Sequence, residues 1–106
     1  MSKLSNSKFR TIVMRPEDSV AVALQEIAAG IQVEVNVPSK ESITILLKET
    51  IEFGHKFSIR PIKAGSDIMK YGEVIGRALK NIEEGEHVHV HNLEGTRGRG
   101  DKVVTD

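Results

Sequence analysis

The sequence contains no cysteine and no tryptophan, and Phe9, Phe53, Phe57 and Tyr71 are its only aromatic residues. The absence of cysteine excludes disulfide scaffolds, thiolate zinc sites, iron–sulfur clusters and cysteine nucleophiles. A metal ion would need histidine, carboxylate or carbonyl ligands. Base-stacking surfaces require several exposed rings and are excluded as well. Any hydrophobic core must be built from isoleucine, valine, leucine and alanine.

The chain also lacks an excess of either charge, because 15 Lys and Arg residues balance 15 Asp and Glu residues. This balance argues against nucleic acid as a partner. The longest apolar run, residues 20–24, is far short of the roughly 20 residues that cross a bilayer, and the N-terminal segment has no signal-peptide core. We therefore expect a cytoplasmic protein that binds neither nucleic acid nor membrane.

At 106 residues, the chain has the size of one domain. Residues 1–16 carry four basic side chains and no acid. We expect a basic arm and the first strand over residues 1–17 and a single domain over residues 18–93. Residues 94–106, which include Arg97 and Arg99 among glycines, should form a flexible tail.

A seven-residue phrase, Ile-x-x-Gly-x-x-apolar, occurs four times, beginning at Ile27, Ile51, Ile62 and Ile82. Glycine adopts positive φ without steric cost, and branched neighbours favour strands. We interpret the phrases as hairpin corners of a mostly β domain with at most one or two short helical turns. Strands are expected at residues 11–14, 19–25, 32–37, 43–47, 56–60 and 86–92, and a helical turn at residues 73–79.

Three of the four histidines, His87, His89 and His91, alternate with Val88 and Val90. On a strand, this spacing places the imidazoles on one face and the valines on the other. Neighbouring imidazoles would then be close enough to share a metal ion or to flank one substrate. A solvated strand face is the alternative interpretation.

Two other short segments carry chemically useful side chains. His55 follows Gly54 at an expected turn, where it is either a site residue or an ordinary surface histidine. Lys70 and Tyr71 precede Gly72, and an ammonium beside a phenol can hold a carboxylate. An ordinary turn with a half-buried tyrosine explains the second segment equally well.

Several phrases together resemble the N-terminal domain of the altronate and galactarate dehydratase family, also called the UxaA family, whose small domain belongs to the SAF group. They are Gly54-His55-Lys56-Phe57, Lys70-Tyr71-Gly72, Ile75-Gly76 and Gly85-Glu86-His87-Val88-His89-x-His91-Asn92. The resemblance runs from about residue 18 to residue 92. It implies a small SAF-type β-clip fold and a cytoplasmic role in carbohydrate-acid catabolism, in which a hexonate or hexarate loses water to give a 2-keto-3-deoxy acid. It also implies a divalent metal, iron or manganese, in the complete enzyme.

Full-length members of this family carry a much larger second domain, whereas this sequence stops at Asp106. We therefore expect the small subunit of a hydro-lyase that needs a separate large catalytic subunit and has no appreciable turnover alone. The resemblance extends to the small subunit of sulfolactate sulfo-lyase, so the eliminated group stays open. A non-catalytic module that binds sugar acids or carbohydrate, or assists assembly, is the alternative from another class. Self-association through strand edges is also left open.

The resemblance and the chemistry of elimination together suggest roles for individual residues. Removing a β-hydroxyl needs a base for the proton α to the carboxylate, charge to stabilise the anion formed, and an acid for the leaving group. We expect His89 and His91 to transfer protons, and direct metal ligation by this pair is the second choice. The expected substrate-binding residues are His55, Lys70, Tyr71 and Asn92.

Overall fold

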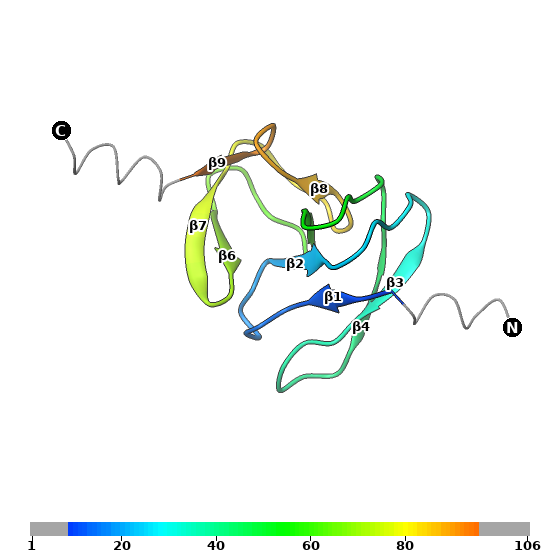
Figure 1. Cartoon of the computed structure of the whole chain (residues 1–106). Coiled ribbons are helices and arrows are strands. Elements are labelled where there is room, and N and C mark those ends of the chain that lie inside the picture. Colours follow the sequence, from blue (N-terminus) through cyan, green and yellow to red (C-terminus); the bar gives the residue numbers. More distant parts are fainter. Residues whose placement is uncertain (1–8, 96–106) are drawn as a thin grey trace, which may run out of the picture.

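The computed structural model describes residues 9–95, which form nine β-strands and no helix (Figure 1). In chain order, the strands are β1 (Thr11–Ile12), β2 (Val20–Ala23), β3 (Gln32–Val35), β4 (Ile43–Leu46), β5 (Lys56–Ser58), β6 (Asp67–Lys70), β7 (Glu73–Ala78), β8 (His87–Val88) and β9 (Leu93–Gly95). The prediction of a small, mostly β domain is confirmed. No helix of the described part is long and apolar enough to cross a membrane.

The strands form three antiparallel sheets. A four-stranded sheet has the order β1-β2-β5-β8, β3 pairs with β4, and a three-stranded sheet has the order β6-β7-β9. In Figure 1 the four-stranded sheet lies between the β6–β7 hairpin and the β3–β4 hairpin. All four residues of β2 are buried, as expected for a strand that is covered on both faces.

The third sheet was not expected from the sequence, and the helical turn predicted at residues 73–79 is wrong. This segment forms β7, which pairs with β6 on one side and with β9 on the other. Tyr71 and Gly72 connect β6 to β7 with φ angles of 56° and 78°. Two consecutive positive φ angles define the tight turn that directs the chain back as a paired strand. Because of this tight turn, the residues that follow it form a strand paired with β6.

The four Ile-x-x-Gly phrases are not hairpin corners, because each connects strands of different sheets. They instead pair with one another: Ile27 with Ile51, and Ile62 with Ile82, through two backbone hydrogen bonds in each pair. The glycine N–H of every phrase donates to a carbonyl four residues before the isoleucine of its partner phrase. All four glycines have φ between 85° and 90°, so the predicted positive φ is confirmed.

Each pair of phrases belongs to one of two hydrophobic clusters. Ile27 and Ile51 lie in a cluster with Phe57, whereas Ile62 and Ile82 lie in a cluster with Val88. Side chains alternate along β5 and β8, so Phe57 and Val88 point to opposite faces of the four-stranded sheet. The sheet therefore lies between the two clusters. The repeated phrase thus pairs residues 27–33 with residues 51–57 beside one core, and residues 62–68 with residues 82–88 beside the other.

The strand boundaries differ from the expected ones at the C-terminal end. The tail was expected to begin at residue 94, but Glu94 and Gly95 belong to β9 and pair with β7. The rest of the expected tail, residues 96–106 with Arg97 and Arg99, lies outside the described residues, as do residues 1–8 of the expected basic arm.

Candidate functional site

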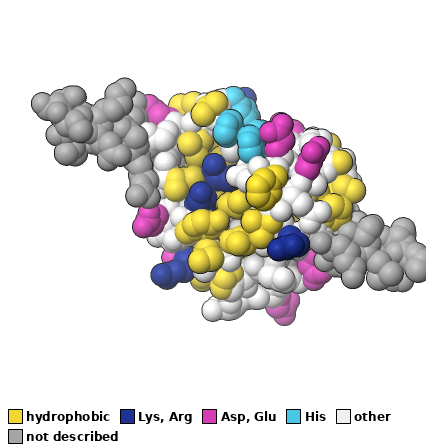
Figure 2. All heavy atoms as spheres, viewed as in Figure 1, with side chains coloured by type: hydrophobic (Ala, Val, Ile, Leu, Met, Phe, Trp, Pro, Cys, Tyr) yellow, Lys and Arg dark blue, Asp and Glu magenta, His cyan; other side chains and the backbone are white. Residues whose placement is uncertain are grey.

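All four histidines of the sequence come together in the folded chain. The ring centroid of His55 lies 5.1 Å from that of His87 and 4.6 Å from that of His89, and both pairs are stacked. The rings of His87 and His91 are 5.5 Å apart and tilted. Figure 2 shows the imidazoles gathered at the surface beside acidic side chains. We call these four residues the imidazole cluster.

The four-stranded sheet creates the imidazole cluster by placing β5 next to β8. Phe57 is the backbone partner of His87 in this pairing, and His55 lies two residues before Phe57. The chain reaches His55 through the Gly54 turn, where the Gly54 N–H donates to the carbonyl of Ala23. Residues 32 positions apart in the sequence are thereby held side by side.

The extended His87–Asn92 segment predicted from the sequence is wrong beyond Val88. The chain leaves β8 and turns, with the N–H groups of Asn92 and Leu93 both donating to the carbonyl of His89. Val90 is 74% exposed and does not face the core. The imidazoles still project together, since His87 and His89 stack at 5.4 Å. The prediction that these rings lie next to one another is confirmed. The backbone that carries them is the end of a strand followed by a turn, and not one continuous strand.

Asn92 holds that turn in place. Its side chain is 1% exposed, its Oδ1 accepts from the backbone N–H of His89 at 2.9 Å, and its Nδ2 donates to the carbonyl of His87 at 2.9 Å. Asparagine side chains commonly replace backbone partners in turns in this way. Both polar ends of the amide are thus engaged with the backbone that carries two of the imidazoles. Substrate binding by Asn92 stays a prediction, and the observed contacts give it a positioning role.

A direct contact between two imidazoles links the segments of the cluster. His55 Nδ1 lies 2.9 Å from His87 Nε2, so one of these nitrogens donates to the other. Glu52 Oε1 lies 3.6 Å from His55 Nε2 and favours a proton on that nitrogen. With the proton on His55 Nε2, His55 Nδ1 would accept the hydrogen bond from His87 Nε2.

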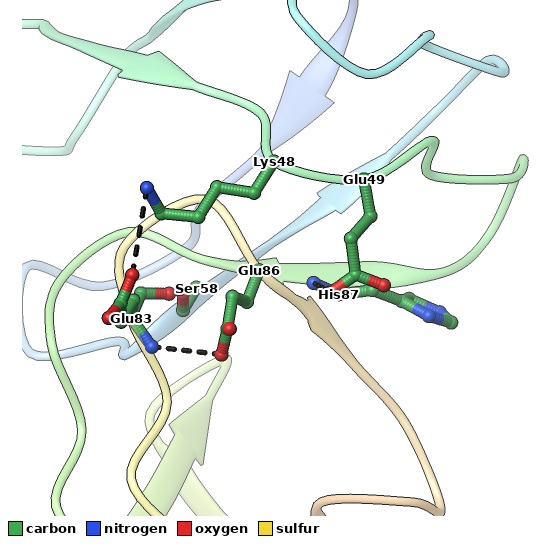
Figure 3. A network of polar contacts seen from close by, with 6 residues as sticks. All are labelled: Lys48, Glu49, Ser58, Glu83, Glu86 and His87. Carbon is green, nitrogen blue, oxygen red and sulfur yellow. Dashed lines mark hydrogen bonds and ion pairs between the residues drawn. The ribbon is translucent and has the colours of Figure 1, made fainter.

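Polar contacts with neighbouring segments hold residues 83–87, which lead into β8 (Figure 3). Lys48 Nζ lies 3.6 Å from Glu83 Oε1, and the Glu83 N–H donates to Glu86 Oε1 at 3.0 Å. The Ser58 hydroxyl also donates to the carbonyl of Glu83. Glu49 lies beside His87 in the same view, and its Oε2 accepts from the backbone N–H of His87 at 3.4 Å.

Electrostatics favour the neutral forms of His87 and His89. Burial lowers the pKa of His87, and the nearby His55 and His89 lower it further, against an opposing effect of Glu49. Burial also lowers the pKa of His89, followed by the effects of His55 and Lys56. A neutral imidazole near pH 7 has a free nitrogen lone pair, which can accept a proton or bind a metal ion.

Lys56 is a site residue that the sequence analysis did not select. It lies on β5, directly after His55, and its backbone partners are Val22 and Val88. Burial lowers the pKa of its ammonium, and the nearby Lys70 lowers it further. Lys56 therefore lies within electrostatic range of both Lys70 and His89. Its position next to His55 at a strand start was the only signal in the sequence.

Lys70 and Tyr71 lie on the β6–β7 hairpin. Lys70 Nζ is 4.9 Å from the centroid of the Tyr71 ring, a cation–π distance. The turn at Tyr71 is tied to the loop before β2, because the Gly72 N–H donates to Asp18 Oδ1 at 2.8 Å. In Figure 1 this turn and the β8–β9 connection lie at opposite ends of the hairpin. Lys70 is thus linked to the imidazole cluster through Lys56, whereas the contacts of Tyr71 lie at the turn.

Two groups of side chains in the described part could hold a metal ion. The ligand atoms of His55, His87 and His89 lie within 4.8 Å of one another, and the same holds for Glu49, His87 and His91. The two metal ligands suggested by the sequence, His89 and His91, therefore belong to different groups, and both groups contain His87. His87 was expected only to share one strand face with His89 and His91, and the folded chain brings His55 against it.

The fold and the cluster define a small all-β domain that presents four neighbouring imidazoles on one surface. Comparison with known proteins gives the family: residues 9–96 match the family described as the altronate/galactarate dehydratase SAF domain. The match covers most of the chain, which therefore belongs to this family.

Curated relatives with two different names are similar to this chain. The chain is 43% identical to the altronate dehydratase of Escherichia coli over 75 residues, and 37% identical to that of Bacillus subtilis over 83 residues. These alignments cover 71% and 78% of this chain but 14% and 16% of the two dehydratases. The chain thus spans a small part of the length of both enzymes.

A third relative has a similar length. The (2R)-sulfolactate sulfo-lyase subunit alpha of Chromohalobacter salexigens is 34% identical over 88 residues, which cover 81% of this chain and 94% of that subunit. The corresponding subunit of Paracoccus pantotrophus is 42% identical over 50 residues. A domain of this kind therefore occurs in one relative within a much longer enzyme and in another as a named subunit.

Proposed function

We propose that this chain is the small, SAF-domain component of a lyase that eliminates a group β to a carboxylate, and that it works with a separate large catalytic subunit in the cytoplasm. The leading candidate reaction is the dehydration of a hexonate or hexarate, of the altronate or galactarate type, to a 2-keto-3-deoxy acid. The imidazole cluster is the observation that carries this proposal.

The cluster suits a site that a second polypeptide completes. Its rings are half-buried or exposed at the surface of the described part, which offers them no enclosing wall (Figure 2). Elimination from a carboxylic acid needs a site from which water is largely excluded, so that charges act strongly on the reacting groups. A large partner subunit lying over the imidazoles would supply that enclosure.

The residues present can supply part of the chemistry. A neutral His89 can accept the proton α to the substrate carboxylate near pH 7, and His91 can return a proton to the leaving group. Lys56 and Lys70 can hold the carboxylate and stabilise the negative charge that develops on it. His55 completes the proposed substrate contacts, whereas substrate binding by Tyr71, whose contacts lie at the β6–β7 turn, stays a prediction. The large subunit must supply the remaining groups.

A divalent metal ion, iron or manganese, is also proposed for the complete enzyme. The imidazole donors of the cluster fit a first-row transition metal, because nitrogen ligands favour these ions over magnesium and calcium. Such an ion would act as a Lewis acid on substrate oxygens. His55, His87 and His89 are the side chains that would hold it in this chain.

Release of sulfite from sulfolactate is the second candidate reaction, and one observation favours it. The chain covers 94% of a relative that is itself named as a sulfo-lyase subunit, whereas it covers 14% of the Escherichia coli dehydratase. Both reactions remove a group from the carbon β to a carboxylate, so the same imidazoles and lysines would serve either.

Reconstitution distinguishes these functions. The full chain is mixed with the large chain from the same organism and Fe²⁺ or Mn²⁺, then assayed on aldonates, aldarates and sulfolactate. We expect turnover of one substrate class by the mixture and none by either chain alone. Silence across the panel, with tight binding of a hexonate or a glycan by this chain alone, would replace the lyase proposal with a non-catalytic binding module.

A further inference from the structure

We infer that Asp18 is a positioning residue of the proposed site, because its buried carboxylate fixes residues 69–72 and thereby holds Lys70 beside Lys56. The inference rests on the proposed function for the role of the two lysines in holding a substrate carboxylate. The position of Lys70 is measurable in this chain alone. The inference and the lyase proposal can therefore fail separately.

Asp18 is the only charged side chain of residues 9–95 that is fully buried, with 0% of its surface exposed. Its Oδ1 accepts from the Gly72 N–H at 2.8 Å, and its Oδ2 accepts from the N–H groups of Met14 at 3.0 Å and Arg15 at 3.2 Å. A carboxylate is costly to remove from water unless hydrogen bonds satisfy its oxygens. These donors belong to the β1–β2 connection and the β6–β7 turn, which lie side by side in Figure 1. The carboxylate thus ties the two segments together.

The segment held in this way is the one that carries Lys70. Ser19, the residue after Asp18, donates its N–H to the carbonyl of Met69 at 2.9 Å, and its Oγ accepts from the Met69 N–H at 3.1 Å. On the other side of Lys70, the Gly72 N–H is bound by Asp18. The backbone of Lys70 is therefore fixed from both sides by two consecutive buried residues.

The β6–β7 turn has a conformation that its own residues do not favour. Tyr71, with φ of 56°, is one of two non-glycine residues of the described part with positive φ. A bulky side chain in this left-handed region is unfavourable, and it persists where surrounding contacts determine the backbone. The Arg15 side chain supplies one contact, since a Cβ at Gly72 would lie 3.0 Å from Arg15 Cγ. Asp18 supplies the other, so loss of its carboxylate should let the turn relax and Lys70 move.

The position of Lys70 matters because of Lys56. Burial, and then the nearby Lys70, lower the pKa of the Lys56 ammonium, and Lys56 in turn lies within electrostatic range of His89. Two ammonium groups repel each other, so the side chains do not hold themselves together. The backbone contacts made by Asp18 and Ser19 keep the two cations adjacent, where a carboxylate can bind to both.

The test measures the pKa of Lys56 by NMR titration of the isotopically labelled full chain. Lys70→Gln calibrates the measurement, because it removes the neighbouring charge and should raise this pKa. Asp18→Ala should produce at least about half of the same rise, because Lys70 moves away. Loss of the negative charge of Asp18 would by itself lower the pKa of Lys56, so a rise reports the movement of Lys70.

Two further variants make the result decisive. Asp18→Asn keeps the volume of the side chain and gives the answer where Asp18→Ala does not fold. Gly30→Ala is the control for lost stability, since Gly30 has φ of 89° but lies between β2 and β3, and it should leave the pKa of Lys56 unchanged. The inference is overturned if a folded Asp18 variant or Lys70→Gln keeps the wild-type pKa of Lys56, or if Gly30→Ala raises it equally.

The reconstituted enzyme separates the inference from the proposed function. Asp18→Asn and Lys70→Gln should each lower kcat/KM by about tenfold or more, and the double variant should lose no more than Lys70→Gln alone, since both act through Lys70. Losses that multiply would overturn the inference. A raised pKa of Lys56 with wild-type kcat/KM for both variants would uphold the positioning of Lys70 and remove its role from the proposed function.

Discussion

At the scale of single residues, the proposed chemistry depends on the turn that follows β8. Asn92 is almost fully buried and forms hydrogen bonds with the backbone of His87 and of His89. No buried side-chain polar atom of the described part is left without a hydrogen-bond partner. Removal of this one amide would leave a backbone donor and a backbone acceptor without partners in the turn that orients two imidazoles.

We predict that Asn92→Ala lowers the free energy of unfolding by about 1–3 kcal/mol, because it leaves two part-buried backbone groups without their partners. Urea denaturation measures this change. Asn81→Ala is the matched control, since the Asn81 side chain is exposed and accepts one hydrogen bond, from the Ala64 N–H. Equal losses for the two variants would contradict the positioning role of Asn92.

The lowered pKa values of His87 and His89 predict how stability depends on pH. Both pKa values lie below the ordinary value of 6.5 in the folded chain, so the unfolded chain binds more protons as the pH falls through 6.5. The chain should therefore be most stable above pH 6.5 and should lose stability as the pH falls toward the folded pKa values.

Urea midpoints measured with chelator present, between about pH 5 and pH 7.5, test this dependence. The midpoint should fall on acidification, and the double variant His87→Asn/His89→Asn should flatten the curve in this range. A wild-type midpoint that rises on acidification would contradict the lowered pKa values of His87 and His89.

At the scale of elements, the four paired phrases hold the sheets in register. The Gly85 turn illustrates their constraint, because a Cβ at this position would overlap the carbonyl oxygen of Leu46. Gly65 has nearly the same φ, 86° against 90°, but has open space around the position of a Cβ. An alanine at position 65 would therefore introduce backbone strain alone, whereas an alanine at position 85 would add steric overlap with Leu46.

We predict that Gly65→Ala costs about 1–2 kcal/mol of stability through its positive φ alone. Gly85→Ala should cost at least about 2 kcal/mol more, because the carbonyl of Leu46 must also move. Thermal or urea unfolding measures both variants. Similar losses for the two would show that the contact between the Gly85 turn and Leu46 does not constrain the fold.

The sequence predicted strands better than it predicted their pairing. Each of the six expected strands contains an observed strand, because alternating branched residues favour the extended state locally. The crossed pairing of the Ile-x-x-Gly phrases depends on contacts 20–24 residues apart, which local patterns do not encode. Residues 73–79 were misassigned for a similar reason: the Tyr71–Gly72 turn and the pairing with β9 make this segment a strand.

The candidate site was predictable in part. The spacing of His87, His89 and His91 indicated a cluster of imidazoles, and the structure brings these rings together. His55 was expected to bind substrate, but its contacts with the other imidazoles and the position of Lys56 depend on the pairing of β5 with β8, which local sequence patterns do not encode. The burial of Asn92 depends on a turn that replaced the expected strand.

At the scale of the whole molecule, the surface around the imidazole cluster also carries exposed apolar side chains. Phe53 is 69% exposed and lies two residues before His55, and Val90 lies between His89 and His91 with 74% exposed. Large exposed apolar side chains next to functional residues are typical of protein interfaces. We expect both to be covered by the large subunit.

We predict that Phe53→Ser and Val90→Ser each weaken association with the large chain by about tenfold or more, which corresponds to about 1.4 kcal/mol. Titration calorimetry measures the affinity. Met14→Ser is the control, because Met14 is also exposed but lies in the β1–β2 connection, where its N–H donates to Asp18, the residue that also holds the β6–β7 turn. A larger effect for Met14→Ser would place the partner on another face.

The central claim is that the imidazole cluster takes part in elimination chemistry within a two-chain enzyme. The most direct measurement is the turnover of the reconstituted enzyme when this chain carries His89→Ala, compared with Lys63→Ala at an exposed position outside the cluster. We expect a loss of turnover of about 10²-fold or more for His89→Ala, with unchanged assembly, and wild-type turnover for Lys63→Ala. Full turnover of the assembled His89→Ala enzyme would contradict this claim.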